Sequence, residues 1–194
     1  MTFLKSFLKM LLSFAPWLFF LIIAQHSMFR LKVGIIGAAV LTVVMCVARL
    51  HRGVIMWVGI LFFTYAIVAV VLLNNMWAVH YMGALANGAL AVGTWMGMAL
   101  KRPFTLEYAR EHTDPSLWKN PAFLRTNYFM TTIWGVVFTV NASLALQRSI
   151  QPTMPGWVYE AITYVLLVSA MFFSTWYPEN LRRRRSAQAS QAGK

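Results

Sequence analysis

The chain has 194 residues, of which 59% are hydrophobic and only 11% are charged. Because soluble domains carry about 25% charged residues, this composition excludes an ordinary water-soluble domain. The formal net charge of +12 arises from basic residues that lie between or beyond long apolar runs, where they set membrane topology and attract anionic lipids, so we do not expect a nucleic-acid partner.

Six apolar runs have the length of membrane-spanning helices, since roughly 17 to 25 residues cross the hydrocarbon. The first run has the basic start of a signal peptide but no convincing cleavage site, so we expect it to be retained. The second is the shortest, and a re-entrant or tilted segment is an alternative there. The predicted fold is an all-α, six-helix transmembrane bundle in one domain, residues 1–181, with spans at 10–29, 33–48, 54–73, 76–100, 127–146 and 157–177.

The basic residues predict the orientation of these spans. With the N-terminus inside, only three of the 17 lie outside, namely Arg30, Lys32 and Arg148. Cytoplasmic connections carry such an excess of Lys and Arg. We therefore expect a multi-pass membrane protein with both termini in the cytoplasm.

The fourth run contains a stripe of small residues. Ala89, Gly93 and Gly97 recur at intervals of four, which places them on one helix face and lets a second helix approach closely. This pattern predicts either a central helix of the bundle or the face of a homodimer. The sequence leaves both open.

Few polar groups lie at membrane depth. Asn87 and Asn141 are amides within predicted spans, and Glu160 is the one acid there. Hydrogen bonding between helices explains such amides most simply, whereas a polar path for a substrate is the functional alternative. Glu160 lies within one turn of the predicted outer interface, and Arg148 is close to it in sequence.

The sequence offers no constellation for catalysis, a metal or a cofactor. The histidines are His26, His51, His80 and His112, and no pair of them has the spacing that places two ligands on one helix face. A haem between His26 and His80 is a remote alternative. The single cysteine, Cys46, excludes an intramolecular disulfide.

The connection from Lys101 to Pro121 is the most distinctive loop, with three of the five acids. Pro103 should end the fourth helix, a short amphipathic helix should follow over 104–112, and Asp114 before Pro115 has the pattern of a helix N-cap. We expect cytoplasmic surface helices that either simply connect two spans or dock a partner. The candidate docking residues are Phe104, Glu107, Tyr108, Arg110, Glu111 and Trp118.

A catalytic pair of Glu107 and Glu111 is the weakest interpretation of this loop, because no nucleophile or metal cluster is near. The tail, residues 182–194, begins with four arginines and ends in small polar residues. We expect it to be disordered, with its basic cluster anchoring the chain at anionic headgroups. The cluster is Arg182, Arg183, Arg184 and Arg185.

The order of features resembles the intracellular septation protein A family, the YciB-like inner-membrane proteins of bacteria. The similar elements cover most of residues 14 to 145: a proline-aromatic first span over 14–20, a basic second loop, the ending Lys101-Arg102-Pro103-Phe104, Trp118 in the inner loop, and a fifth span with Asn127, Trp134, Phe138 and Asn141. The resemblance implies a role in envelope maintenance or septation through protein partners, with no catalytic residues to transfer.

Two functions follow from these patterns. The leading hypothesis is a non-enzymatic scaffold or envelope factor that binds other membrane or division proteins. The alternative is a small transporter or channel subunit whose polar path involves Asn87, Asn141 and Glu160. A membrane-embedded enzyme ranks third, since fold alone assigns no chemistry.

Overall fold

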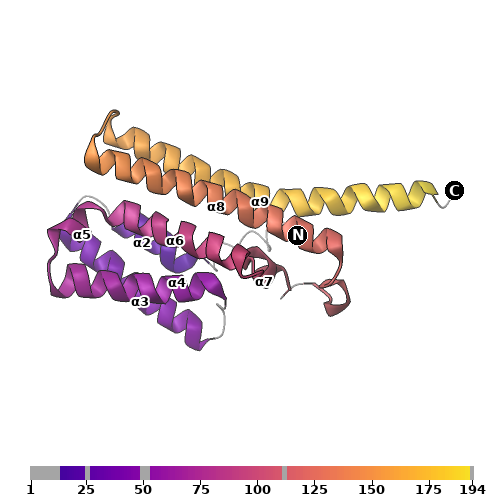
Figure 1. The fold of residues 1–194 in the computed structure, drawn as a ribbon, viewed down its shortest axis with the longest axis horizontal. Coiled ribbons are helices and arrows are strands. Elements are labelled where there is room, and N and C mark those ends of the chain that lie inside the picture. The colour runs from indigo at the N-terminus through magenta and orange to yellow at the C-terminus, as the bar shows by residue number, and fades with distance from the viewer. Residues whose placement is uncertain (1–13, 25–26, 49–52, 111–112, 193–194) are drawn as a thin grey trace.

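The computed structural model describes residues 14–24, 27–48, 53–110 and 113–192, with side chains up to Leu181, and every regular element in these ranges is helical (Figure 1). The elements are α2 (Ala15–Ile23), α3 (Met28–Val47), α4 (Val54–Ala66), the π-helix η1 (Ile67–Leu72), α5 (Met76–His80), α6 (Met82–Ala99), α7 (Phe104–Arg110), the 3-10 turn η2 (Pro115–Leu117), α8 (Pro121–Ile150) and α9 (Gly156–Ala192).

Four helical segments are long and apolar enough to cross a membrane. They are α3, α4 with η1, α8, and α9 as far as Leu181. A fifth candidate arises if α6 and α7 count as one broken span, since these two helices meet at 73°. A helical fold with helices long and apolar enough to cross a membrane is thus confirmed over the described residues, with four or five candidate spans where the sequence predicted six.

The boundary between the first two predicted spans was wrong. We expected a helix to residue 29 and the next from residue 33, whereas α2 ends at Ile23 and α3 begins at Met28. The cause is Ser27, whose side chain accepts a 3.1 Å hydrogen bond from the Arg30 N–H. Such a cap satisfies a free amide of the first helical turn. The second run, predicted to be the shortest, therefore forms a 20-residue helix.

The fourth predicted span is not one continuous helix. It is interrupted at Tyr81, between α5 and α6, and it ends at Ala99. Ser149 of α8 contacts the chain beside this interruption: its hydroxyl donates to the His80 carbonyl oxygen at 3.1 Å, and the His80 ring contacts the Ser149 carbonyl oxygen at 2.8 Å. The backbone bonds of Tyr81 are kept, since its N–H donates to the Trp77 carbonyl oxygen at 3.1 Å and its own carbonyl oxygen accepts from the Leu85 N–H at 2.9 Å.

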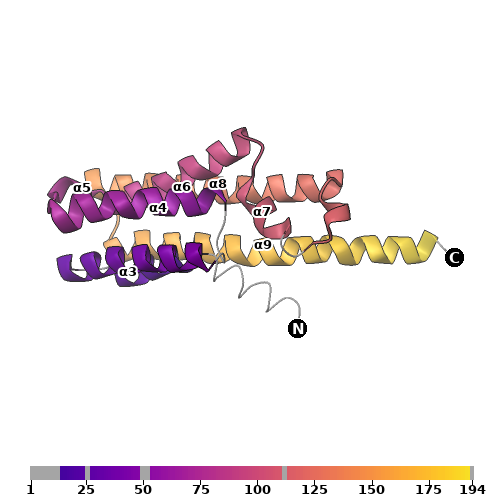
Figure 2. The same ribbon diagram turned by 90° about the horizontal axis from the view of Figure 1, so that it is seen from below.

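The last two helices are longer than predicted. Asn120 caps α8 by accepting from the Ala122 N–H at 2.9 Å, so the helix begins six residues before the predicted residue 127. The backbone of α9 continues to Ala192, where the sequence predicted a disordered tail. Arg, Ala and Gln all favour helix, which explains the continuation. Figures 1 and 2 show α8 and α9 side by side, with α9 extending beyond the other helices.

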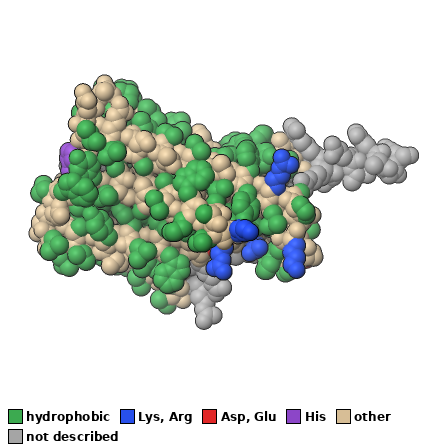
Figure 3. All heavy atoms as spheres, in the orientation of Figure 1, with side chains coloured by type: hydrophobic (Ala, Val, Ile, Leu, Met, Phe, Trp, Pro, Cys, Tyr) green, Lys and Arg blue, Asp and Glu red, His purple; other side chains and the backbone are tan. Residues whose placement is uncertain are grey.

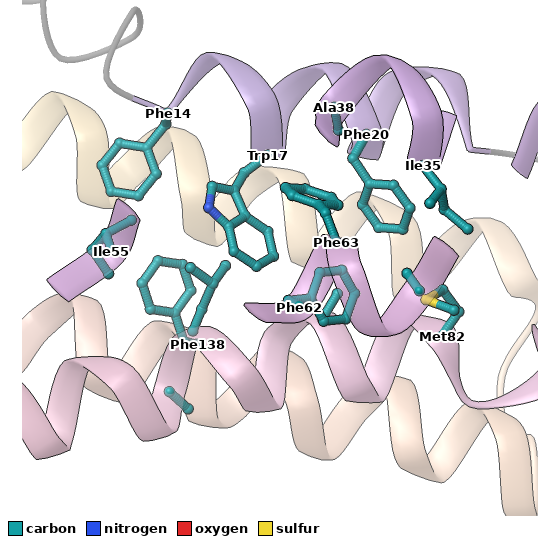
Figure 4. Close-up of a cluster of buried hydrophobic side chains, with 14 of the residues drawn as sticks. Phe14, Trp17, Phe20, Ile35, Ala38, Ile55, Phe62, Phe63, Met82 and Phe138 are labelled. Atoms are coloured by element: carbon teal, nitrogen blue, oxygen red, sulfur yellow. The ribbon is translucent and has the colours of Figure 1, made fainter. Parts of the chain in front are cut away.

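Most of the core lies between α2, α3, α4, α6 and α8, and it is rich in aromatic side chains (Figure 4). Trp17 of α2 packs on Phe62 and Phe63 of α4 with ring centroids 5.2 and 5.0 Å apart, and Phe20 meets the same two rings edge-on. Such aromatic pairs stabilise by roughly 0.5–1.5 kcal/mol beyond the area they bury. The cluster fixes α2 against α4.

The outer surface is apolar over much of the bundle. Figure 3 shows hydrophobic side chains across the visible face. The Lys and Arg side chains on this face lie toward the end of the bundle that holds α7. Large side chains such as Val40, Leu61 and Val165 are exposed by 56%, 69% and 63%. Apolar exposure on this scale is expected where lipid is the solvent. We call the end of the bundle with Lys101, Arg102, Arg110, Lys119 and Arg125 the cationic end.

Candidate functional site

The connector between α6 and α8 is folded into the cationic end of the bundle. Lys101 adopts a left-handed conformation with φ of 58°, and the Arg102 N–H donates to the Gly97 carbonyl oxygen at 2.7 Å, which terminates α6. Pro103 is buried and precedes α7. The sequence therefore predicted the helix stop correctly, although α6 ends at Ala99 and the chain turns before the proline.

The first turn of α7 packs inside the protein. Phe104 is 1% exposed and its ring meets those of Phe14 and Trp134 with centroids 6.0 and 6.4 Å apart. The buried Thr105 hydroxyl lies 2.7 Å from both the Asn127 carbonyl oxygen and the Thr131 hydroxyl. These contacts attach α7 to α8, because buried hydroxyls that lose such partners are costly.

The second turn of α7 is attached to α4. The Glu107 carboxylate accepts a 3.3 Å hydrogen bond from the Val54 N–H, the first residue of α4. Gly53 precedes it with φ of 93°, and a side chain at this glycine would overlap the Glu107 carboxylate. A negative group at a helix N-terminus also interacts favourably with the helix dipole. Glu107 therefore caps α4 from across the bundle.

The environment of Glu107 shifts its titration. The residue lies outside the four long apolar helices, and partial burial raises the pKa of its carboxyl above the ordinary value. The Val54 N–H and the charges of Arg102 and Arg110 oppose this shift only in part. Desolvation disfavours the charged form of the carboxyl. Glu107 therefore accepts its structural hydrogen bond at the cost of burying a charge. Glu111, its proposed catalytic partner, lies outside the described residues.

The remaining connector, residues 113–120, is exposed and ordered by local bonds. The Asp114 carboxylate accepts from the Ser116 N–H at 2.8 Å, and bonds from Ser116 lower the pKa of this exposed carboxyl. The Trp118 indole N–H donates to the Thr113 carbonyl oxygen at 3.0 Å, and the Arg110 guanidinium lies 5.5 Å from the Trp118 ring centroid. This last contact is a cation–π interaction.

The candidate docking residues therefore differ in whether they are buried or exposed. Phe104 is buried, Glu107 is engaged with α4, and Tyr108 is half-buried against the core. The side chains that face outward are Arg110, Lys119 and Leu117, the last of which is 46% exposed. The candidate docking residues did not include Leu117, although an apolar face formed by Leu117 and Trp118 was expected from the sequence.

The three residues of the candidate polar path do not converge. Glu160 pairs with Arg148 at 3.1 Å, with side chains that are 28% and 44% exposed. Asn141 is fully buried, and neither polar atom of its side chain has a partner in the described part of the protein. It lies seven residues before Arg148 on α8, which corresponds to about 10 Å along the helix axis.

Asn87 lines a cavity that Asn141 does not. The cavity measures about 90 Å³ and lies between α2, α6, α8 and α9, with apolar walls that include Trp17, Leu90 and Phe138. The Asn87 amide donates to the Gly83 carbonyl oxygen of its own helix at 2.9 Å. One amide in an apolar chamber provides no continuous polar path.

The small-residue stripe lies within the bundle. A methyl group built on Gly93 would overlap Val58 of α4, and one built on Gly97 would come within 3.4 Å of Val54. Ala89 packs against the buried core. Close approach of two helix backbones is the expected use of such a stripe, and here the partner is α4 of the same chain.

Several other sequence predictions are placed by the structure or lie outside it. No group of three or more His, Cys, Asp or Glu side chains able to hold a metal occurs among the described residues. The side chains of Arg182, Arg183, Arg184 and Arg185 fall outside the described ones. Sequence analysis did not anticipate the structural role of Gly53. The available signal was the position of this glycine directly before an apolar run.

Comparison with known proteins gives no assignment. No family model matches the chain, and no curated protein and no solved structure is significantly similar to it.

Proposed function

We propose that the chain is a non-catalytic, multi-pass scaffold of the bacterial inner membrane, and that the outward face of its α6–α8 connector docks a protein partner. The observation that carries this proposal is the fixed connector. Phe104, Thr105 and Glu107 hold its first half against α8 and α4. This held half presents Arg110, and local hydrogen bonds order residues 113–120, so the exposed residues are presented at little entropic cost to binding.

The exposed face is also suited to a protein surface. It offers two cations, Arg110 and Lys119, around an exposed leucine and a half-buried tryptophan, Trp118. Aromatic residues and arginine are enriched where proteins bind one another. The resemblance to the septation protein A family supports a partner in cell division or wall synthesis.

We further propose that this face is cytoplasmic. Six crossings with both termini inside place 14 of the 17 basic residues on the cytoplasmic side, as the positive-inside rule requires. Phosphatase and fluorescent-protein fusions after Leu117 and after Lys194 should both report the cytoplasm. Opposite locations would overturn the orientation.

Site-specific photo-crosslinking in living cells tests the docking face. A photoreactive amino acid at Leu117 should capture a discrete division or wall-synthesis protein. The same amino acid at Gln151, which is exposed in the connector at the other end, is the matched control and should not capture it. No discrete product at Leu117, or the same product at both positions, would contradict the proposal.

A small transporter is the second candidate, and Asn141 is the observation that favours it. The Asn141 amide is buried without a partner among the described residues, which is costly in a membrane protein, and a solute or water that reached it would satisfy it. Flux of small solutes into liposomes should then fall when Asn141 is replaced by Leu. Equal flux in wild type, Asn141→Leu and empty liposomes would eliminate this candidate.

A further inference from the structure

A groove separates the start of α8 from the later part of α9 at the cationic end. Its volume is about 540 Å³. The first two turns of α8 form one wall and α9 forms the other. The lining residues are Pro121, Ala122, Arg125, Thr126, Phe129, Tyr177 and Leu181.

The polar part of the groove is cationic. Arg125 is exposed and has no carboxylate within ion-pair distance among the described residues, and no acid lines the groove. Tyr177 adds a phenolic hydroxyl, which can donate a hydrogen bond. An arginine without a partner offers five donors in the planar arrangement that matches a phosphate.

The apolar part of the groove begins one helical turn further along α8. Phe129 follows Arg125 by four residues, so both lie on the same helix face. The Phe129 ring is 45% exposed and packs on the rings of Tyr177 and Phe173 with centroids 5.5 and 6.3 Å apart. A polar donor beside an exposed aromatic wall matches an amphipathic ligand.

The apolar wall continues toward the opposite end of the bundle. On α8 it reaches Val136 and Val140, which are 49% and 39% exposed and follow Phe129 by seven and eleven residues, so all three lie on one helix face. From Arg125 to Val136 the rise along α8 is about 16 Å. That distance is comparable to one leaflet of the roughly 30 Å hydrocarbon core.

We propose that this groove binds one anionic phospholipid, with the headgroup phosphate at Arg125 and an acyl chain along Phe129 toward Val136. The commitment to a lipid rests on the apolar wall, which free phosphate would leave uncovered. The commitment to an anionic lipid rests on an arginine that no described acid neutralises. This site is independent of the docking connector proposed above.

Native mass spectrometry of the delipidated full chain in detergent tests the site. The probes are dioleoylphosphatidylglycerol and dioleoylphosphatidylcholine, which share acyl chains and differ in net charge. We expect the first phosphatidylglycerol molecule to bind more tightly than phosphatidylcholine. Arg125→Gln should weaken that first binding about fivefold, the change expected for one interfacial arginine.

Arg148→Gln is the matched control, because it removes the same charge at the other end of α8, where Arg148 pairs with Glu160. It should retain wild-type lipid binding, as should Arg125→Lys in large part. Replacing the four tail arginines by Gln should leave the effect of Arg125→Gln intact. Helical circular dichroism checks that each variant is folded.

Three outcomes would overturn the proposal. The first is equal binding of the two lipids by the wild type. The second is an equal effect of Arg125→Gln and Arg148→Gln, which would indicate unspecific attraction. The third is displacement of phosphatidylglycerol by millimolar glycerol phosphate, which would identify a free-phosphate site.

Discussion

The connectors at the two ends of the bundle are held against the helices by different contacts. The α6–α8 connector at the cationic end has a buried phenylalanine, a buried threonine pair and a carboxylate that caps another helix. The α8–α9 connector, residues 151–155, has no buried side chain of its own, and a 3.0 Å bond from the Thr153 N–H ties it to the hydroxyl of Tyr159, which is 2% exposed. Residues at the first end should therefore contribute far more stability than those at the second.

The largest expected effect is that of Phe104→Ala. Removing a ring that is 1% exposed and contacts Phe14 and Trp134 leaves a cavity, which costs roughly 3–5 kcal/mol. Unfolding of the purified protein in mixed micelles with increasing SDS should show this loss. Phe172→Ala, at a site that is 53% exposed, is the size-matched control. Equal losses would show that Phe104 is not part of the core.

Gly53→Ala should have the next largest effect. The backbone conformation at Gly53 strains any side chain, which costs roughly 1–3 kcal/mol, and the new methyl group would displace Glu107 from the start of α4. Gly88→Ala is the control, because a methyl group there meets nothing within 4 Å and alanine favours helix by about 1 kcal/mol. The same SDS titration should separate the two variants by the sign of their effects.

Glu107 should give a smaller effect that depends on pH. Its folded-state pKa is raised, mainly by burial, so its contribution to stability is fully present below the unfolded-state pKa and is lost as pH rises through the folded-state value. Glu107→Gln keeps an acceptor for the Val54 N–H without the charge. We expect this variant to be at least as stable as wild type at pH 7 and to show a flatter stability profile between pH 4 and pH 8. A variant with the wild-type slope would contradict the assigned cause.

The smallest effect should come from Glu160→Gln. The ion pair with Arg148 is exposed, and such pairs contribute about 0–1 kcal/mol. The loss should shrink further in high salt, where exposed charges are screened. A salt-independent loss of several kcal/mol would mean that this end is as rigid as the cationic one.

The sequence predicted the helical membrane fold well because its signal is simple. Long apolar runs, prolines and helix caps such as Asp114 act on residues that are close in sequence. The helix stop before Pro103 was predicted from such a local signal. The helix breaks at Ser27 and Tyr81 were missed. Beside the second, Ser149 contacts His80, and a contact between residues this distant in sequence forms only in the fold.

The candidate site was predicted less well, for the same reason. The sequence marked Glu107 as a candidate docking or catalytic residue, yet its carboxylate accepts a hydrogen bond from the Val54 N–H, 53 residues earlier in the chain. Likewise, the polar path grouped Asn141 with Glu160 by type, whereas Glu160 is paired and Asn141 is buried elsewhere along the bundle. Pairings between distant segments carry no periodic signal.

Hydrogen–deuterium exchange in lipid nanodiscs tests most directly whether the α6–α8 connector is an integral part of the bundle. Peptides over Phe104–Arg110 should exchange as slowly as the start of α8, while residues 151–155 exchange rapidly. Exchange of both connectors at the same rapid rate would contradict a fixed connector and, with it, the proposed docking face.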